Sequence, residues 1–271
     1  MTFLQATPSQ KSTPSGHIRA RVCEDILLNV VSSRHDRQAA FELIYRSYLQ
    51  SGQCAKNDSG MRATPYQLLS TTDLILAKLR GQAISTVSLV RDGALGLPIE
   101  SLCPEEVALR RASGIRLAEV SSLADRRQGT ARFFGLFCEL SRLMIQLASK
   151  TRIGELLVAV NPQHAPLYRR YLAFEQIGDE RICEIGQGFP AIPLSLNFAK
   201  AQVERRDCWA DLIGEPLPDE ILQSCPITAE DRQYFFSVLD SCSEQSAAWP
   251  QRSASFGDSE AADSARQLVK L

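Results

Sequence analysis

Hydrophobic residues recur along the chain with two periods, which predict strands and helices in turn. Short apolar or alternating runs predict strands over 18–31, 73–81, 83–93, 115–124 and 154–160. Apolar residues about three to four positions apart predict helices over 35–52, 101–114, 131–150 and 164–174. The runs at 73–81 and 83–93 form a predicted hairpin, and residues 180–198 form a closing one. This order predicts a mixed α/β fold, in which helices cover a central sheet.

The clearest predicted helix spans 131–150. Its apolar stripe consists of Phe133, Phe134, Phe137, Leu140, Met144 and Leu147. The opposite, polar side holds Arg132, Glu139, Arg142 and Gln146. The next strand, "GELLVAV" at 154–160, is apolar without interruption, which is typical of a strand that is buried on both faces.

Changes in composition divide the chain into four parts. Residues 1–16 are rich in Ser, Thr, Pro and Gln, and we expect them to be disordered. Residues 17–200 form the predicted α/β core. Residues 201–241 are helical in pattern and punctuated by proline, which indicates an extension outside the sheet. The Ser- and Ala-rich tail at 242–271 is again expected to be disordered.

Charge and cysteine usage exclude several classes of protein. The net charge is −1 and the arginines are scattered along the chain, so no basic patch for nucleic-acid binding is predicted. With three histidines and no Cys-x-x-Cys pair, no metal site is predicted, and the eight cysteines read as reduced cytosolic thiols. The N-terminus lacks the apolar core of a signal peptide, and charges interrupt the most apolar segment, 131–149. We therefore expect a cytoplasmic protein without a transmembrane segment.

The turn between the strand at 115–124 and the helix at 131–150 carries candidate chemistry. Its sequence is "RRQGTA", from Arg126 to Ala131. Gly129 lets the backbone approach a phosphate closely, the first helical N–H groups point toward it, and arginine adds positive charge. A glycine and an arginine also occur in such turns for purely structural reasons, so the motif alone leaves both interpretations open.

With this turn, the chain resembles the GNAT superfamily of acyltransferases, whose pyrophosphate loop has the form Arg/Gln-x-x-Gly-x-Gly/Ala. A second motif follows the next strand. It consists of Asn161, the pair Leu167-Tyr168, and Leu172-Ala173-Phe174. Ala173 stands where the superfamily usually has glycine. The alternative is a helix whose apolar residues merely pack the core.

A narrower resemblance extends over roughly residues 18–198. The stretches "GALGLPIES", "RLAEVSSLA" and "VNPQHAPLYRRYLAF" are similar to the N-acyl amino acid synthase family, relatives of the acyl-homoserine-lactone synthases. Those autoinducer synthases carry Glu, then Ser or Thr, then Arg on the corresponding strand. Glu119 and Ser121 match, but Ser122 stands in place of the arginine. This departure argues against homoserine-lactone synthesis and favours an amino acid as the acceptor.

The resemblance implies a donor site and a co-substrate. The implied donor-binding residues are Ser121, Leu123, Arg126, Arg127, Gly129, Thr130, Ala131 and Asn161. The donor would be an acyl-phosphopantetheine thioester, carried by coenzyme A or by an acyl carrier protein, with no permanently bound cofactor. An acidic carrier protein would dock on Arg126, Arg127 and Arg132, although such a cluster is also common on solvated surfaces.

Amide formation requires a base for the amine and an acid for the leaving thiolate. Glu119 is the candidate base, because a partly desolvated carboxylate has a raised pKa. Its alternative role is an ion pair with an arginine, of which the candidates are Arg110, Arg111 and Arg116. Tyr168 occupies the position that commonly protonates the thiolate, or else is a buried packing residue. His164 either assists the base or binds the acceptor's carboxylate, or simply caps a helix.

The sequence therefore predicts an N-acyltransferase that joins a long acyl chain to a small amine. Two alternatives remain open: a short-chain, coenzyme A-dependent N-acetyltransferase, and a GNAT-like module that binds a thioester or a partner protein without catalysis. A deep apolar channel leading from Glu119 would favour long chains. Placement of Glu119 and Tyr168 in different clefts would favour the non-catalytic module.

Overall fold

A computed structural model of the chain describes residues 26–126, 130–183 and 188–240. The strands are β1 (Ile26–Val30), β2 (Thr72–Leu79), β3 (Gln82–Arg91), β4 (Leu117–Asp125), β5 (Glu155–Val160), β6 (Glu175–Gln176), β7 (Arg181–Cys183) and β8 (Phe189–Asn197). The helices are α1 (Arg34–Gln50), α2 (Pro104–Ala112), α3 (Thr130–Lys150), α4 (Ala165–Tyr171), α5 (Phe198–Glu204), α6 (Arg206–Ile213) and α7 (Ala229–Asp240). Two short 3-10 helices are η1 (Pro65–Leu68) and η2 (Pro98–Ser101).

The mixed α/β fold predicted from the sequence is confirmed. The predicted order of strands and helices matches the observed one from β1 through α4, and the predicted closing hairpin is formed by β7 and β8. The two-residue strand β6, which lies between α4 and β7, was not predicted. The segments predicted to be disordered, 1–16 and 242–271, lie outside the described residues.

The strands form one sheet with the order β1-β2-β3-β4-β5-β8-β6, and β7 also pairs with β8. Strands β4 and β5 are parallel, whereas the other described pairings are antiparallel. Only three residue pairs join β4 to β5, and the last of them is Glu119 with Leu157. Beyond this pair β4 continues to Asp125 and β5 to Val160 without pairing to each other, so the sheet opens between them.

A β-bulge in β4 lies next to this opening. Thr86 pairs with Ala124 and Ser88 with Ser121, so Val87 faces two residues of β4 instead of one. Ser122, one of those two, has a φ of +54°. The extra residue reverses the faces to which the following side chains point, because side chains alternate along a strand.

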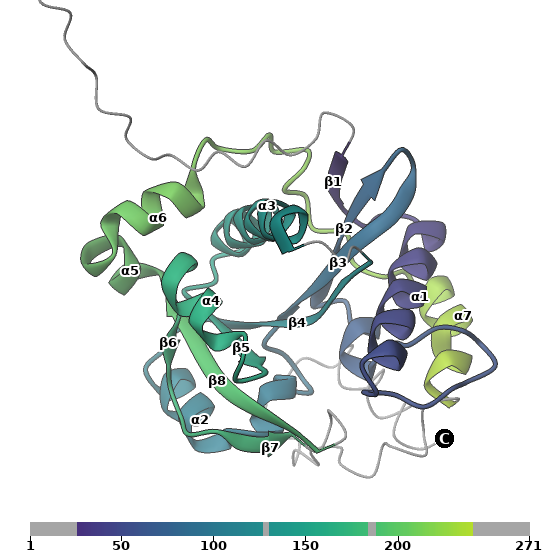
Figure 1. The fold of residues 1–271 in the computed structure, drawn as a ribbon, viewed down its shortest axis with the longest axis horizontal. Helices are drawn as coiled ribbons and strands as arrows, with labels where there is room; N and C mark the ends of the chain where they lie inside the picture. Colours follow the sequence, from purple (N-terminus) through teal and green to yellow (C-terminus); the bar gives the residue numbers. More distant parts are fainter. Residues whose placement is uncertain (1–25, 127–129, 184–187, 241–271) are drawn as a thin grey trace, which may run out of the picture.

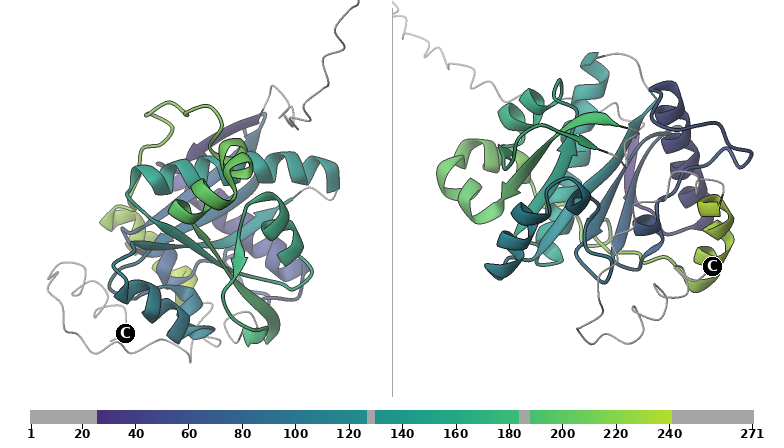
Figure 2. Two further views of the ribbon diagram at one scale, coloured as in Figure 1. Left: turned by 90° about the vertical axis from the view of Figure 1, so that its left-hand side faces the viewer. Right: turned by 90° about the horizontal axis from the view of Figure 1, so that it is seen from below.

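Helices cover both faces of the sheet (Figures 1 and 2). Helices α3 and α4, with α5 and α6 beside them, pack on one face over the largest apolar cluster. Helices α1 and α2 pack on the other face over two smaller clusters. Strand β2 shows the expected alternation, since Ile75 and Ala77 belong to the first cluster while Leu74 and Leu76 belong to the second.

Residues 205–240 cross from one face of the sheet to the other. The loop after α6 is held by Gln146 of α3, whose amide nitrogen donates to the carbonyl oxygens of Ile213 and Glu215 and whose amide oxygen accepts from the backbone N–H of Leu217. Farther along, the ring of Phe235 in α7 packs against Phe41 of α1, with ring centres 5.1 Å apart. Gln146, which the sequence pattern assigned to a polar side, is therefore buried beneath this segment.

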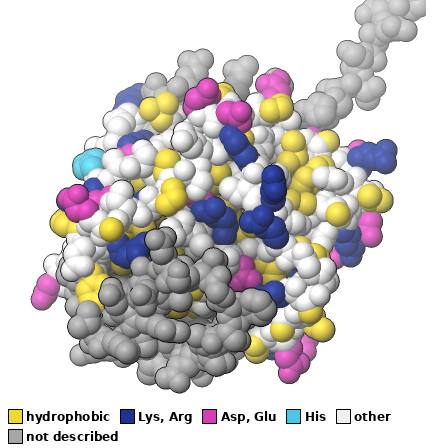
Figure 3. All heavy atoms as spheres, turned by 180° about the vertical axis from the view of Figure 1, so that it is seen from behind, with side chains coloured by type: hydrophobic (Ala, Val, Ile, Leu, Met, Phe, Trp, Pro, Cys, Tyr) yellow, Lys and Arg dark blue, Asp and Glu magenta, His cyan; other side chains and the backbone are white. Residues whose placement is uncertain are grey.

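The surface carries both signs of charge. In the view from behind, lysine and arginine side chains gather toward the middle of the face and acidic side chains lie mostly toward its edges (Figure 3). Within the described ranges, no helix combines the length and the apolar character that a membrane crossing requires.

Mutation of Gln146 tests how segment 205–240 is attached to α3. Gln146→Ala leaves two carbonyl groups and one N–H without their partner, and we expect it to lower the free energy of unfolding by about 2 kcal/mol or more. Denaturant unfolding of the full chain measures this value. Gln50→Ala, an exposed change at the end of α1, is the matched control and should have little effect. Equal stability of the two variants would contradict this attachment.

Candidate active site

Glu119 lies where β4 and β5 separate. Its side chain is 4% exposed, and it points toward the face of the sheet that α1 and α2 cover. A carboxylate oxygen accepts a hydrogen bond of 2.6 Å from the backbone N–H of Ile99 in η2. A carboxylate is therefore buried at the edge of the opening in the sheet, with a backbone donor directed at it.

The segment "GALGLPIES" positions this donor. Leu97 and Ile99 are buried, which fixes η2 against the sheet beside Glu119. Glu100 accepts from the backbone N–H of Leu97 at 2.8 Å and closes the turn. Gly96 has a φ of +70°, and a side chain there would come within 2.2 Å of the Glu100 carboxylate. This turn therefore requires glycine at position 96.

No described basic side chain forms an ion pair with Glu119. The arginines proposed as its partners are used elsewhere: Arg110 pairs with Glu155 at 2.7 Å, and Arg111 pairs with Asp92 at 2.6 Å and with Glu100 at 2.7 Å. The alternative interpretation of Glu119, an ion pair with Arg110 or Arg111, is therefore wrong, and Arg116 forms no such pair with it either.

Without a counterion, the buried carboxylate has a shifted pKa. Burial raises the pKa of Glu119 to about 8; the Ile99 N–H opposes the rise, and the negative charge of Glu100 adds to it. Such a group is protonated at low pH and becomes able to accept a proton near pH 8. This behaviour suits a general base for an amine.

Two tyrosines share this environment. Burial raises the pKa of Tyr66, and the negative charges of Glu119 and Glu100 raise it further. Burial also raises the pKa of Tyr48 on α1, whereas the positive charge of Arg62 and a hydrogen bond with Ser122 oppose the rise. No sequence motif marked Tyr48 or Tyr66 as part of a site.

Tyr168 lies on α4, over the other face of the sheet. Its side chain is 6% exposed, and its ring contacts Phe137 and Phe174 with ring centres 5.3 and 5.5 Å apart. Burial raises its pKa, and the nearby Tyr48 phenol contributes to the rise. Tyr48 therefore interacts electrostatically with both Glu119 and Tyr168, although these two belong to opposite faces of the sheet.

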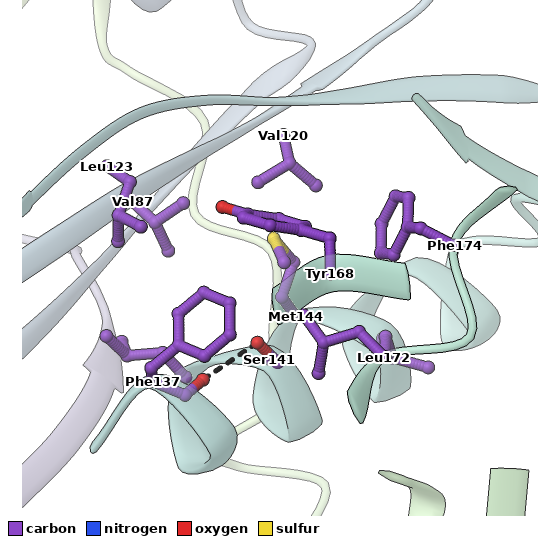
Figure 4. Close-up of a pocket in the computed structure, with 11 residues that line it drawn as sticks. Val87, Val120, Leu123, Phe137, Ser141, Met144, Tyr168, Leu172 and Phe174 are labelled. Atoms are coloured by element: carbon purple, nitrogen blue, oxygen red, sulfur yellow. Dashed lines mark hydrogen bonds between the residues drawn. The ribbon is translucent and has the colours of Figure 1, made fainter. Parts of the chain in front are cut away.

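An apolar pocket surrounds Tyr168 (Figure 4). Its lining consists of Val87, Val120, Leu123, Phe137, Leu140, Ser141, Met144, Ile145, Tyr168, Leu172 and Phe174. The Tyr168 ring crosses the pocket from α4, and its hydroxyl points toward Val87 and Leu123 on the strands. The Ser141 hydroxyl donates a hydrogen bond of 2.7 Å to the Phe137 carbonyl within α3, so its proton is not available to a ligand. The pocket is small, with room for roughly one water molecule.

The remaining predicted site residues lie in three places. Ser121 and Leu123 are half-buried on β4 beside the bulge. Asn161 shapes the turn after β5, where its side-chain oxygen accepts from the Gln163 N–H. His164 precedes α4 and is exposed, with its Nε2 atom 3.4 Å from the Gln163 amide nitrogen, and its side chain makes no capping hydrogen bond. The structure thus does not bury His164 with Glu119 and Tyr168.

The predicted phosphate-binding turn is described only in part. Arg126 is exposed, and its backbone N–H donates to the Ile84 carbonyl at 2.8 Å. Helix α3 begins at Thr130 and continues through Ala131. Arg127 and Gly129 lie outside the described residues. The donor-binding roles of these residues stay predictions.

Comparison with known proteins now decides the family. The sequence model of the N-acyl amino acid synthase FeeM family matches residues 39–197, which is more than half of the chain. The chain belongs to this family. It is an N-acyltransferase, which transfers an acyl group to an amine. No curated protein matches the sequence significantly.

Solved structures share the fold. FeeM, an N-acyl amino acid synthase from uncultured soil microbes, is 24% identical over 64% of this chain and 89% of its own, with a TM-score of 0.54. The acyl-homoserine-lactone synthase LasI is 15% identical over 71% of this chain and 96% of its own, with a TM-score of 0.53. The synthase BjaI is 13% identical over 77% and 98%, with a TM-score of 0.51.

One departure from the superfamily pattern has a structural explanation. Ala173, which stands where glycine is usual, has a φ of +55°. This left-handed conformation is the one that glycine adopts most readily, and alanine adopts it here at a modest cost in free energy. The backbone conformation at position 173 of this chain is therefore one that favours glycine.

The raised pKa of Glu119 predicts a specific dependence of stability on pH. In the unfolded chain Glu119 loses its proton near the usual pKa of a glutamate, whereas in the native state it keeps the proton up to about pH 8. This group therefore makes the free energy of unfolding fall as the pH rises toward 8, and it contributes no further change above that pH. Glu119→Gln keeps an acceptor for Ile99 but cannot ionise. Relative to wild type, it should gain stability between pH 5 and pH 8, on the order of a few kcal/mol.

Melting temperatures of the two proteins across this pH range test the prediction. Glu155→Gln is the matched control, because Glu155 is equally buried but pairs with Arg110 and accepts from Asn197. Loss of that pair should destabilise the protein at neutral pH. A Glu119→Gln variant that behaves like Glu155→Gln would contradict the description of Glu119 as an unpaired carboxylate.

Proposed function

We propose that this N-acyltransferase moves a long acyl chain from a phosphopantetheine thioester to the α-amine of an amino acid. Glu119 acts as the general base and Tyr168 as the general acid. The observation that carries the proposal is Glu119 itself, a buried carboxylate at the point where β4 and β5 separate, with no counterion among the residues that the structure describes.

The reaction exchanges a C–S bond for a C–N bond. The acceptor's ammonium group first loses one proton to solvent. Glu119 then accepts a second proton from the neutral amine as its nitrogen adds to the thioester carbonyl. The tetrahedral intermediate collapses by losing the thiolate, which takes the proton of the Tyr168 hydroxyl. The products are an amide and a free thiol, and solvent returns a proton to Tyr168 and removes one from Glu119.

The donor fits the opening in the sheet. Beyond Glu119, β4 has no hydrogen-bonded partner on the side of β5, so its backbone groups are available to the amides of a pantetheine arm. This arm would lead to the turn at 126–131, where the N-terminus of α3 favours a phosphate. Arg126, Arg127, Gly129, Thr130 and Ala131 would then contact the phosphate, as the sequence motif predicts.

Glu119 and Tyr168 approach this opening from opposite faces. A thioester lying in the opening would present its carbonyl carbon to an amine on the side of Glu119 and its sulfur to Tyr168. The electrostatic coupling of Tyr48 to both groups supports their belonging to one site. Because the two groups lie on opposite faces and Glu119 does not line the pocket at Tyr168, catalysis requires the thioester to lie in the opening between them. A module that only binds a thioester stays the alternative, and the activity test below separates the two.

The lining of the pocket at Tyr168, which does not include Glu119, supports a long acyl chain over an acetyl group. Apart from Ser141 and the Tyr168 hydroxyl, its lining side chains offer only hydrocarbon, aromatic rings and the sulfur of Met144. Because the pocket is this small, a chain must displace side chains as it enters. Flexible residues such as Met144 make this possible. Coenzyme A and an acyl carrier protein both present the acyl chain on the same phosphopantetheine arm.

Activity is tested by incubating the purified protein with dodecanoyl-coenzyme A or dodecanoyl carrier protein and the standard amino acids, and identifying amides by mass spectrometry. Glu119→Gln should lower turnover on the order of 100- to 10,000-fold while leaving the affinity for the donor nearly unchanged. In the wild type, kcat/KM should rise with pH up to about 8, the pKa of Glu119, and this limb should disappear in the variant.

Donor affinity by calorimetry and melting temperature serve as controls for this comparison. A folded Glu119→Gln protein that binds the donor and turns over at the wild-type rate would remove Glu119 from the mechanism. Absence of any amide product from the wild type with every donor would refute the proposed function as a whole.

Ser141 provides a test of the acyl pocket. Ser141→Leu adds carbon atoms inside the pocket, and its hydroxyl bonds only to its own helix. We expect kcat/KM for dodecanoyl donors to fall about tenfold or more, whereas acetyl or butanoyl donors should react as in the wild type. Ser149→Leu, an exposed change on the same helix, is the matched control. An equal loss for short and long chains in Ser141→Leu would show that the pocket does not hold the acyl chain.

A further inference from the structure

Arg62 lies beside the candidate active site but has no role in the mechanism above. It belongs to the loop between α1 and η1, and its backbone N–H donates to the Phe41 carbonyl of α1 at 3.1 Å. Its guanidinium carbon lies 4.5 Å from the centre of the Tyr48 ring. The side chain is half-buried. A cation is thus held in place against an aromatic ring at the site.

The charge of Arg62 is not neutralised by the described part of the chain. No carboxylate there lies within ion-pair distance of its guanidinium group, and no hydrogen bond is made by its side chain. Arg111, by contrast, is also half-buried on this face but contacts both Asp92 and Glu100. A half-buried guanidinium without a counterion retains its capacity to bind an anion.

Tyr48 connects Arg62 to the proposed general base. The charge of Arg62 acts on the Tyr48 phenol, which also interacts with the charge of Glu119. Helix α1, which carries Tyr48, packs against β4, the strand that carries Glu119. Arg62, however, is not a counterion of Glu119, since the two do not form an ion pair. One acceptor-binding region therefore contains a proton acceptor at Glu119 and a separate cation at Arg62, with a phenol close to both.

This arrangement matches the two ends of an α-amino acid, a positive ammonium group and a negative carboxylate on one carbon. We propose that Arg62 binds the carboxylate of the acceptor, with the Tyr48 phenol as an additional donor, while the amine faces Glu119. This inference rests on the proposed function and deepens it, because it assigns the residue that selects α-amino acids over amines without a carboxylate. Arg62 is a substrate-binding residue here, because it contacts the acceptor.

The experiment compares amino acids with their carboxamides, which keep the amine and side chain but lack the negative charge. The wild type should prefer the acids in kcat/KM. Arg62→Gln should reduce this preference about 10- to 100-fold, the range expected for loss of a charge-assisted hydrogen bond, mainly through a higher KM for the acid. Arg62→Lys keeps the charge but loses the planar fork, so its preference should lie between the two.

Controls separate this role from a structural one. Arg46→Gln removes an exposed charge from the same helix as Tyr48, and it should leave the preference unchanged. KM for dodecanoyl-coenzyme A and the melting temperature should be the same in Arg62→Gln as in the wild type. An equal loss of activity toward acids and carboxamides would mean that Arg62 only supports the loop by stacking, and the inference would be overturned.

Failure of the inference is distinguishable from failure of the proposed function. A wild type that acylates amino acids and their carboxamides equally well overturns the role of Arg62 while the acyl transfer stands. A wild type that forms no amide product refutes the function. In that case, calorimetry of the standard amino acids with the wild type and Arg62→Gln still tests Arg62, because the inference requires weaker binding to the variant.

Discussion

The short pairing between β4 and β5 is the constraint on which the rest of this structure depends. Three residue pairs join the strands, and hydrogen bonding between them ends at Glu119. The bulge at Ser122 turns the remainder of β4, and α3 and α4 continue the chain on one side of the gap. A sheet paired along its full length would have no room for a thioester between these strands and no unpaired backbone to hold one.

The carboxylate of Glu119 is tolerated at this place at a cost in stability. A buried ionised group without a counterion is unfavourable, and the protein relieves this by raising the pKa and supplying the Ile99 N–H. The nearby arginines do not pair with Glu119, because Arg110 forms an ion pair with Glu155 and Arg111 forms one with Asp92. Strong pairing of these arginines elsewhere therefore keeps Glu119 able to take up a proton, which is the kind of compromise expected at a catalytic site.

The two faces of the sheet carry different groups of the proposed active site. Helices α3 and α4 supply the apolar pocket and Tyr168, which concern the acyl group and the leaving thiolate. Helix α1 and the loop after it supply Tyr48 and Arg62, which concern the acceptor. Segment 205–240 packs on both sides, through Gln146 and Phe235, and so connects the helices of the two faces.

The sequence by itself determined the class of fold, the order of its elements and the family, because period-two and period-3.6 patterns and local motifs depend on neighbours along the chain. It also marked Glu119 and Tyr168. The tertiary structure alone decided that Arg110 and Arg111 pair elsewhere and that Gln146 is buried. It also decided that Arg62 stacks on Tyr48, whose phenol interacts with Glu119. These facts depend on side chains brought together from segments distant in the chain, and on the desolvation that follows, which no local pattern encodes.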